Sequence, residues 1–200
     1  MDGAVATKAS PAPLPPLRAA SDRIAAPAAN EALIVSYEPA TGAELWRGKP
    51  CDVNEVVDRA RRAWPEWAAQ PLSTRMELLR RFANEVRKEA ENLAVLIARE
   101  VGKPLWEAHS EVESVVAKVE VSIRAYAERT SQRKLDSALQ GAMAVRHKPH
   151  GVLLVLGPYN FPAHLPNAHI VPALIAGNAV VFKPSEKAPA TGELLALSLI

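Results

Sequence analysis

The sequence predicts an α/β fold, in which part of a parallel sheet follows a layer of N-terminal helices. Two unbroken apolar runs carry this prediction, residues 152–156 (VLLVL) and residues 179–182 (AVVF). Runs of this kind are typical of strands buried on both faces of a sheet. The segment 157–178 between them is long enough for a crossover helix, so we expect a βαβ unit with parallel strands.

The first 30 residues differ in composition from the rest of the chain. They are rich in alanine and proline, and such a segment has little apolar surface to bury. We expect residues 1–30 to be a disordered leader. A secretory signal is not expected because no apolar stretch follows Lys8, and Asp2 and Asp22 weaken the alternative of a transit peptide.

Two short strands and a first helix are expected next. Residues 33–37 and 44–47 flank the turn sequence Pro39-Ala-Thr-Gly42, which predicts strand, turn and strand. Asp52 is the expected N-cap of a helix, with Glu55 at capping-box spacing. Pro65 is expected to end that helix and to leave Trp67 in a short turn.

Further helices follow as amphipathic patterns. Ser73 is the expected cap of one helix, and a later helix should end at Gly102-Lys-Pro104. A long helix is expected from Trp106 to about Thr130, and the helices up to that point should cover the sheet as one layer. The polar segment 132–144 and the following Val-Arg-His predict an exposed β-hairpin. Residues 188–200 predict a final helix capped near Thr191.

Composition narrows the class of protein. Hydrophobic residues make up 48% of the 200 residues and charged residues 23%, which are values of a globular domain. The net charge of +2 favours neither binding nor avoidance of nucleic acid, and no apolar run reaches the ~18 residues of a membrane span. We expect neither nucleic acid nor membrane as a partner. The single cysteine, Cys51, excludes an intrachain disulfide framework and fits a reducing compartment.

Polar residues follow both predicted strands of the βαβ unit. Asn160 and Lys183 fall just past the carboxyl ends, where open α/β sheets bind ligands. The Asn160 amide could donate to an oxyanion, or it could cap the helix expected near Pro162, and local sequence alone favours the cap. Lys183 and Glu186 could equally be a solvated surface pair.

Metal binding and cysteine catalysis are not expected in this part of the chain. The two histidines at 147 and 150 flank Pro149, and the five-residue spacing of His164 and His169 separates them around a helix. Cys51 has no histidine nearby in the sequence, so we do not expect it to act as a nucleophile.

Several of these motifs carry a resemblance to a known family. The sequences Gly157-Pro-Tyr-Asn-Phe-Pro162 and Lys183-Pro-Ser-Glu186 resemble the N-terminal part of NAD(P)-dependent aldehyde dehydrogenases. The longer stretches 147–151 (HKPHG) and 159–174 (YNFPAHLPNAHIVPAL) are similar to the succinylglutamate-semialdehyde dehydrogenase branch. The resemblance covers about residues 33–200. It implies a truncated aldehyde dehydrogenase fold, with residues 31–200 as the first part of a Rossmann-like cofactor-binding domain.

The resemblance also implies roles for individual residues. The residue matching Asn160 stabilises the thiohemiacetal oxygen, and those matching Lys183 and Glu186 bind the adenosine ribose. A carboxylate there favours NAD over NADP. Helical spacing from Asn160 would place His164 and Asn167 on one face, where one of them is expected to hold a substrate carboxylate. Pro166 could distort this spacing, and the alternative is that both residues bond backbone freed by that proline. The remaining expected contacts are Leu156 and Pro158 for the cofactor, and Phe161, His164, Asn167 and Ala168 for the substrate.

The implied function is the NAD-dependent oxidation of an aldehyde to a carboxylate. The implied substrate is N-succinylglutamate 5-semialdehyde, in arginine catabolism, and the implied setting is a cytoplasmic homo-oligomer with the hairpin 135–149 at a subunit interface. The family's nucleophilic cysteine, general-base glutamate and glycine-rich cofactor turn lie beyond residue 200. An alternative is therefore an inactive truncated chain that at most binds nucleotide weakly or associates with full-length subunits.

Overall fold

The structure is a computed structural model that describes residues 33–131, 133–135 and 143–199. The expected leader 1–30 and part of the expected hairpin lie outside the described residues. At the centre is the predicted βαβ unit, formed by strand β5 (Val152–Leu156), helix α5 (His164–Ile175) and strand β6 (Ala179–Lys183). The strands pair in parallel from Val152↔Ala179 to Leu156↔Lys183, which confirms the α/β prediction.

Strand β5 is less buried than its sequence predicts. Val155 is 3% exposed, whereas Leu154 and Leu156 are 59% and 67% exposed. The expectation of a strand buried on both faces is therefore wrong for the described chain. The reason is that β6 pairs with β5 on one edge only, and the helices packed on this two-stranded sheet leave these two leucines uncovered.

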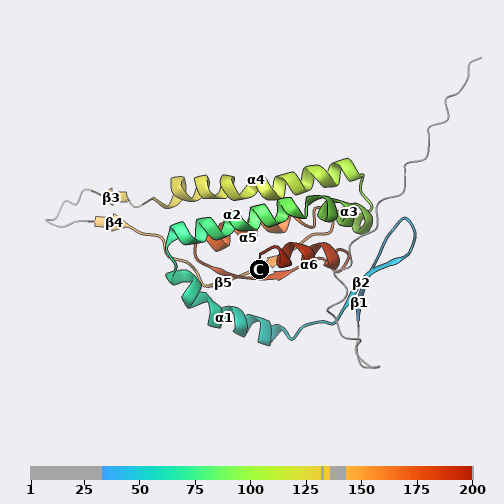
Figure 1. The fold of residues 1–200 in the computed structure, drawn as a ribbon. Helices are drawn as coiled ribbons and strands as arrows, with labels where there is room; N and C mark the ends of the chain where they lie inside the picture. Colours follow the sequence, from blue (N-terminus) through green and yellow to red (C-terminus); the bar gives the residue numbers. More distant parts are fainter. Residues whose placement is uncertain (1–32, 132, 136–142, 200) are drawn as a thin grey trace, which may run out of the picture.

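The N-terminal part of the described chain is mainly helical. Strands β1 (Ile34–Tyr37) and β2 (Glu44–Gly48) pair antiparallel, as predicted. They are followed by α1 (Val53–Ala69), α2 (Leu72–Lys88), α3 (Ala90–Val101) and α4 (Leu105–Thr130). Strands β3 (Arg133–Leu135) and β4 (Met143–Val145) pair antiparallel and extend away from the body at the end of α4 (Figure 1). Helix α6 (Pro189–Leu197) follows β6.

The helices form layers on both sides of the small sheet. Helix α1 packs against β5 and β6, whereas α2 and α4 pack on α5 (Figure 1). The predicted single helical layer on the sheet is therefore wrong in detail, because α5 lies between the sheet and the α2–α4 pair. The core is the apolar interior of this helical stack, with Leu79, Val86, Leu93, Ile97, Val115, Val119, Val171 and Leu195 at 2% exposure or less.

Three predicted helix boundaries are wrong. Helix α1 continues through Pro65 to Ala69, because the Nε1 atoms of Trp64 and Trp67 donate to the Gly177 and Leu174 carbonyl oxygens at 3.1 and 3.0 Å. These tertiary bonds hold the turn that lacks a backbone donor. Ser73 and Thr191 lie inside their helices rather than at the N-caps. By contrast, Asp52 caps α1 and Gly102 ends α3 in the left-handed conformation, as predicted.

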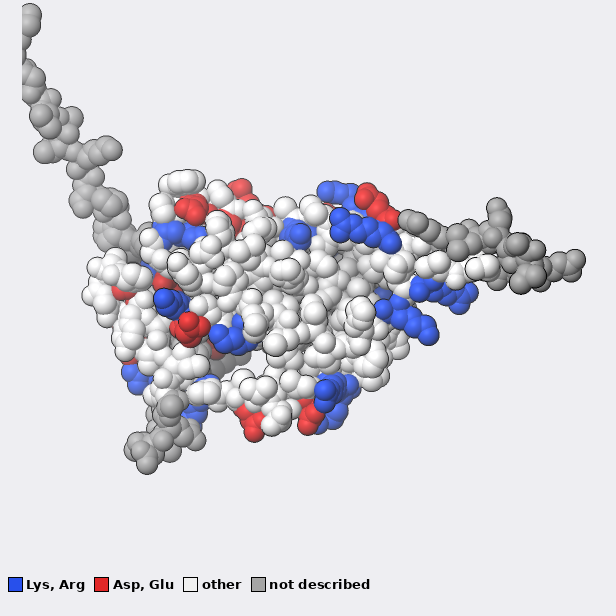
Figure 2. Space-filling model, turned by 180° about the vertical axis from the view of Figure 1, so that it is seen from behind, with Lys and Arg blue, Asp and Glu red and all other residues white. Residues whose placement is uncertain are grey.

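The charged side chains do not form a single-sign patch on the face shown in Figure 2. Lysines and arginines alternate with aspartates and glutamates around its rim, and the centre is largely uncharged. Among the helices of the described residues, none is both long and apolar enough to cross a bilayer.

Candidate functional site

The candidate site lies at the carboxyl ends of β5 and β6. The Gly157 N–H donates to the Lys183 carbonyl oxygen at 2.9 Å, which joins the loop after β5 to the end of β6. A Cβ at Gly157 would lie 3.0 Å from the Phe182 ring, so this close approach favours glycine. The loop 157–163 then carries Asn160 over the sheet edge toward α5.

Asn160 is exposed, and its side-chain amide has no hydrogen-bond partner within the described residues. It does not cap α5, which begins at His164. The cap interpretation is therefore wrong. The amides at the start of this helix are satisfied by a carboxylate from another helix, since Glu111 Oε1 accepts from the N–H groups of Ala163 and His164 at 2.9 and 3.0 Å. The Asn160 amide is left available as a donor.

A buried ion pair between Lys103 and Glu111 contacts the loop that carries Asn160. The Nζ of Lys103 lies 2.8 Å from Glu111 Oε2 and 2.8 Å from the Asn160 carbonyl oxygen. It also lies 4.1 Å from the centroid of the Phe161 ring. The two charged side chains are 8% and 0% exposed. Sequence reasoning missed both residues, because Gly102-Lys-Pro104 signalled only the end of a helix.

Lys183 and Glu186 form an exposed pair at the end of β6. Their Nζ and Oε2 atoms are 3.3 Å apart, and both side chains are more than half exposed. A hydrogen bond from the residue's own backbone N–H, and then the Lys183 ammonium, lower the pKa of Glu186 below its usual 4.5. Glu186 is thus an ionised acceptor at neutral pH. Leu156 is also exposed here, whereas Pro158 is half-buried.

The expected substrate residues on α5 do not share one face with Asn160. Asn160 precedes the helix, so the helical spacing that joined it to His164 and Asn167 does not apply. Asn167 is fully buried against α4, where its Nδ2 donates to the Val115 carbonyl oxygen at 3.0 Å. His164 is half-buried, and its Nδ1 is buried without a partner in the described chain. Phe161 and Ala168 are half-buried.

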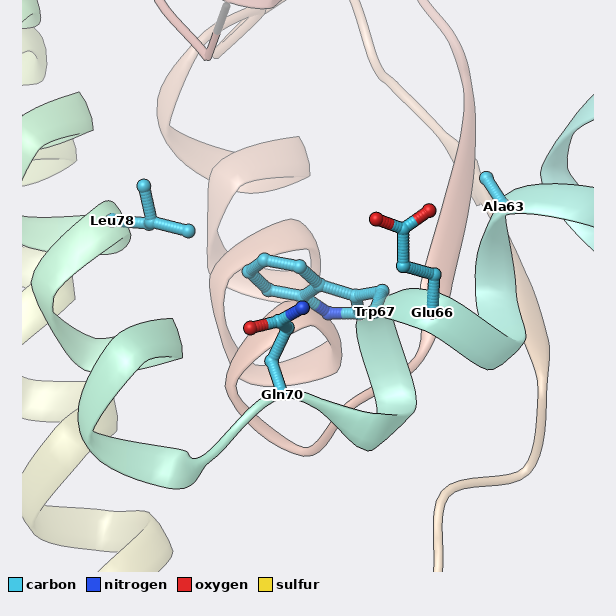
Figure 3. A pocket seen from close by; sticks show the side chains of 5 residues that line it. All are labelled: Ala63, Glu66, Trp67, Gln70 and Leu78. Atoms are coloured by element: carbon cyan, nitrogen blue, oxygen red, sulfur yellow. The ribbon is translucent and has the colours of Figure 1, made fainter.

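A separate hollow of about 320 Å³ lies between α1 and α2 (Figure 3). It is lined by Ala63, Glu66, Trp67, Gln70 and Leu78, none of which is a predicted site residue. The indole of Trp67 forms its floor and is held by the hydrogen bond to Leu174. The hollow is open and carries one charged side chain, so it does not gather groups for catalysis. Among the described residues, no group of three potential metal ligands occurs.

Known proteins resemble this chain in sequence and in fold. The profile of the aldehyde dehydrogenase family matches residues 26–199. The chain belongs to this family. It is similar to the N-succinylglutamate 5-semialdehyde dehydrogenases of Novosphingobium aromaticivorans, with 82% identity over 163 residues, and of Sphingopyxis alaskensis, with 67% identity over 162 residues. These alignments cover 82% and 81% of the chain, but only 35% and 34% of the relatives.

Solved aldehyde dehydrogenase structures share the fold. Lactaldehyde dehydrogenase from Escherichia coli superposes with a TM-score of 0.79 at 30% identity, over 86% of the chain and 36% of that enzyme. An NADP-dependent glyceraldehyde-3-phosphate dehydrogenase from Bacillus halodurans, complexed with NADP, superposes with a TM-score of 0.78 at 29% identity. That alignment covers 84% of the chain and 37% of the enzyme. The chain thus spans about a third of the length of the proteins it matches.

Proposed function

We propose that the chain is the N-terminal part of an NAD-dependent dehydrogenase that oxidises N-succinylglutamate 5-semialdehyde to N-succinylglutamate. The observation that carries the activity is the exposed amide of Asn160, which has no partner in the part of the chain that the structure describes. Its loop is bonded by Lys103 at the carboxyl edge of a parallel sheet. The choice of substrate is supported by the 82% identity to a relative of that name.

Asn160 is proposed as the oxyanion donor. When a nucleophile adds to the aldehyde carbon, the carbonyl oxygen gains negative charge, and a donor already in place stabilises that charge without reorganisation. By family resemblance the nucleophile is a cysteine downstream of residue 200, and a downstream glutamate activates water for release of the acid. Asn160 suits the donor role because its amide is neutral and carries two N–H groups.

The residues at the end of β6 are suited to the adenosine ribose of a nicotinamide nucleotide. The ionised Glu186 can accept hydrogen bonds from ribose hydroxyls, and Lys183 beside it can donate. A carboxylate facing the 2′ position repels a 2′-phosphate, which favours NAD over NADP. Leu156 and Pro158 are proposed as apolar contacts beside it. NAD, when bound, supplies the acceptor for the hydride that leaves the substrate.

His164 is the better candidate for holding a substrate carboxylate. It is half-buried and its Nδ1 is unpartnered within the described residues, whereas the Asn167 amide already donates to Val115. Phe161 and the small Ala168 are proposed to line the rest of the substrate path. In a full-length protein, His164→Leu should lower kcat/KM for the dicarboxylic aldehyde and spare a neutral aldehyde. Equal losses for both would mean a structural role.

The oligomeric state and the cellular location of the protein are proposed from the family resemblance and from exposed side chains. Met143 and Val145 of β4 are 51% and 42% exposed, so this strand of the predicted hairpin 135–149 presents apolar side chains that a second subunit could cover. We propose a homo-oligomer in the cytoplasm, where the free, exposed thiol of Cys51 would stay reduced. Sedimentation of the protein with and without Met143→Lys and Val145→Lys tests the interface.

The second candidate is an inactive chain that at most binds nucleotide weakly or associates with full-length subunits. It rests on the 35% coverage of the Novosphingobium aromaticivorans relative and on the family resemblance, which places the nucleophile and base beyond residue 200. Sequencing the gene past the codon for Ile200 separates the two: an open reading frame supports the enzyme, and a genuine stop supports the inactive chain.

The oxyanion role is tested in a full-length protein made by joining the chain to the downstream part of the Novosphingobium aromaticivorans relative. Asn160→Ala should lower kcat by about 100- to 1000-fold. Asn84→Ala, an exposed position on α2, is the matched control and should leave kcat unchanged. An Asn160→Ala enzyme with normal kcat would remove Asn160 from the chemistry.

A further inference from the structure

We propose that Lys103 and Glu111 are positioning residues for the Asn160 amide, and this inference rests on the oxyanion role proposed above. The pair is unusual for its burial, since the two side chains are 8% and 0% exposed. Burying two charges is costly unless further hydrogen bonds satisfy them. Here they are satisfied by the loop that carries Asn160 and by the start of α5.

Lys103 contacts the main chain of Asn160 and the ring of the residue that follows it. Its Nζ donates to the Asn160 carbonyl oxygen at 2.8 Å and lies 4.1 Å from the centroid of the Phe161 ring. Both contacts leave the Asn160 amide untouched. The ammonium therefore fixes the main chain at the donor position while the donor itself stays available to substrate.

Glu111 divides its two oxygens between two tasks. Oε2 accepts from Lys103 at 2.8 Å, and Oε1 accepts from the amides of Ala163 and His164. One carboxylate thus sets the lysine and the start of α5 relative to each other. Glu107 adds a second carboxylate at 3.7 Å from the lysine Nζ. Through these two carboxylates the loop is anchored to α4, a helix of 26 residues.

The amides at the start of α5 are bonded by Glu111 Oε1 and not by Lys103. The contact of Lys103 with the Asn160 carbonyl oxygen is thus made to the loop itself. Positioning of this kind matters for rate, because a displacement of about 1 Å at a reacting group can lower activity about 100-fold.

The central variant is Lys103→Met in the joined full-length protein. We expect kcat to fall about 10- to 100-fold while KM for NAD stays within about twofold. Lys88→Met is the matched control, because Lys88 forms an exposed ion pair with Glu85 at 2.7 Å on α2. A single Lys103 change leaves Glu111 buried without its partner, so Lys103→Met/Glu111→Gln is the second variant. It removes both charges and keeps an acceptor for the α5 amides.

A double-mutant cycle separates positioning from general damage. If Lys103 acts through Asn160, then Lys103→Met/Asn160→Ala loses no more activity than Asn160→Ala alone. Multiplying losses would instead mean that Lys103 acts elsewhere, and the inference would be overturned. Normal activity of Asn160→Ala would refute the oxyanion role itself. A normal kcat for both Lys103 variants, with Asn160→Ala inactive, would refute the positioning role alone.

Hydrogen exchange gives a readout that does not depend on turnover. In the 200-residue chain, Lys103→Met/Glu111→Gln should speed amide exchange in peptides covering the loop 157–163, and leave the core of α4 near Val115 protected. Unchanged exchange in the loop would show that Lys103 does not hold it, and this result would also overturn the inference.

Discussion

At the residue scale, two buried carboxylates accept the N–H groups at helix starts, a role that the local sequence predicts for capping side chains. Glu111 accepts from the amides at the start of α5, and Glu100 accepts from the N–H groups of Ala190 and Thr191 at the start of α6 at 2.9 and 2.8 Å. Both glutamates lie on other helices. Each helix start is therefore fixed by a tertiary contact, which explains why the predicted caps fail there.

We expect the charge of Glu186 to set the nucleotide preference of the proposed site. In the joined full-length protein, Glu186→Gln should weaken NAD binding several-fold and raise the relative affinity for NADP, because a negative charge opposite the 2′ position is removed. Isothermal titration with both nucleotides checks this. Glu113→Gln is the matched control, because Glu113 is an exposed glutamate on α4. Glu193 is unsuitable because its carboxylate accepts a hydrogen bond from Trp46. Unchanged affinities for both nucleotides would make Glu186 an ordinary surface residue.

Acid should destabilise the fold through Glu38. Hydrogen bonds from Arg99 and then Thr41 lower the pKa of Glu38 below 4.5 in the folded chain. The unfolded chain thus takes up a proton first as pH falls, so this stabilisation is present above about pH 4.5 and is lost as pH drops through the folded pKa. Glu38→Gln should therefore weaken the dependence of the unfolding free energy on pH between about pH 5 and pH 3.

The matched change for this test is Glu44→Gln. The pKa of Glu44 is also lowered, by Arg47, but its side chain is 37% exposed, against 12% for Glu38. Solvent screening should make its effect on the pH dependence smaller. Urea unfolding at several pH values measures both variants. A larger effect from Glu44 than from Glu38 would contradict the assignment.

At the scale of elements, Glu100 joins three parts of the chain. Its carboxylate on α3 accepts from Ser36 of β1 and from the backbone and side chain of Thr191 in α6, each at 2.8 Å. The strand pair at the start of the described chain is therefore tied to the helix that follows the proposed cofactor loop. The same carboxylate is only 3% exposed, so its donors have little access to water.

Glu100→Ala should destabilise the fold strongly. Leaving several buried donors without an acceptor is expected to lower the unfolding free energy by about 3 kcal/mol. Glu91→Ala, which removes an exposed glutamate from the same helix, should change it by less than about 0.5 kcal/mol. Guanidinium unfolding followed by tryptophan fluorescence compares the two, and similar values would show that Glu100 is not a structural hub.

On the scale of the whole molecule, the described chain carries the residues proposed for one edge of an active site. It carries a donor and proposed ribose contacts, while Leu154 and Leu156 of β5 stay exposed. The matched relatives are about three times longer than the aligned region. By family resemblance, the proposed chemistry needs a nucleophile and a base that lie outside that region.

The 200-residue chain alone should produce no NADH from N-succinylglutamate 5-semialdehyde, because a donor without nucleophile and base leaves most of the catalysis missing. The joined full-length protein should produce NADH. Spectrophotometry at the NADH absorbance band compares them, with Cys51→Ala in both forms as the control. Turnover by the short chain that survives Cys51→Ala would contradict the assignment of the missing groups.

Sequence by itself determined the local features of this protein. The apolar runs of β5 and β6, the Asp52 cap and the Gly102 helix end follow from short-range sterics and hydrogen bonding, so neighbouring residues suffice to predict them. The family motif likewise pointed to Asn160, Lys183 and Glu186, because their identities and order lie within short stretches.

Only the tertiary structure decided how those residues are held. Around Pro65, two indoles of helix α1 donate to carbonyl oxygens in the last turn of α5 and just after it. Helix α5 begins at His164, where Glu111, 52 positions before Ala163, accepts from the amides. The same carboxylate brings Lys103 beneath Asn160. Such contacts join residues far apart in the chain, and a buried charge is stable only when they all form together, so no local pattern can signal them.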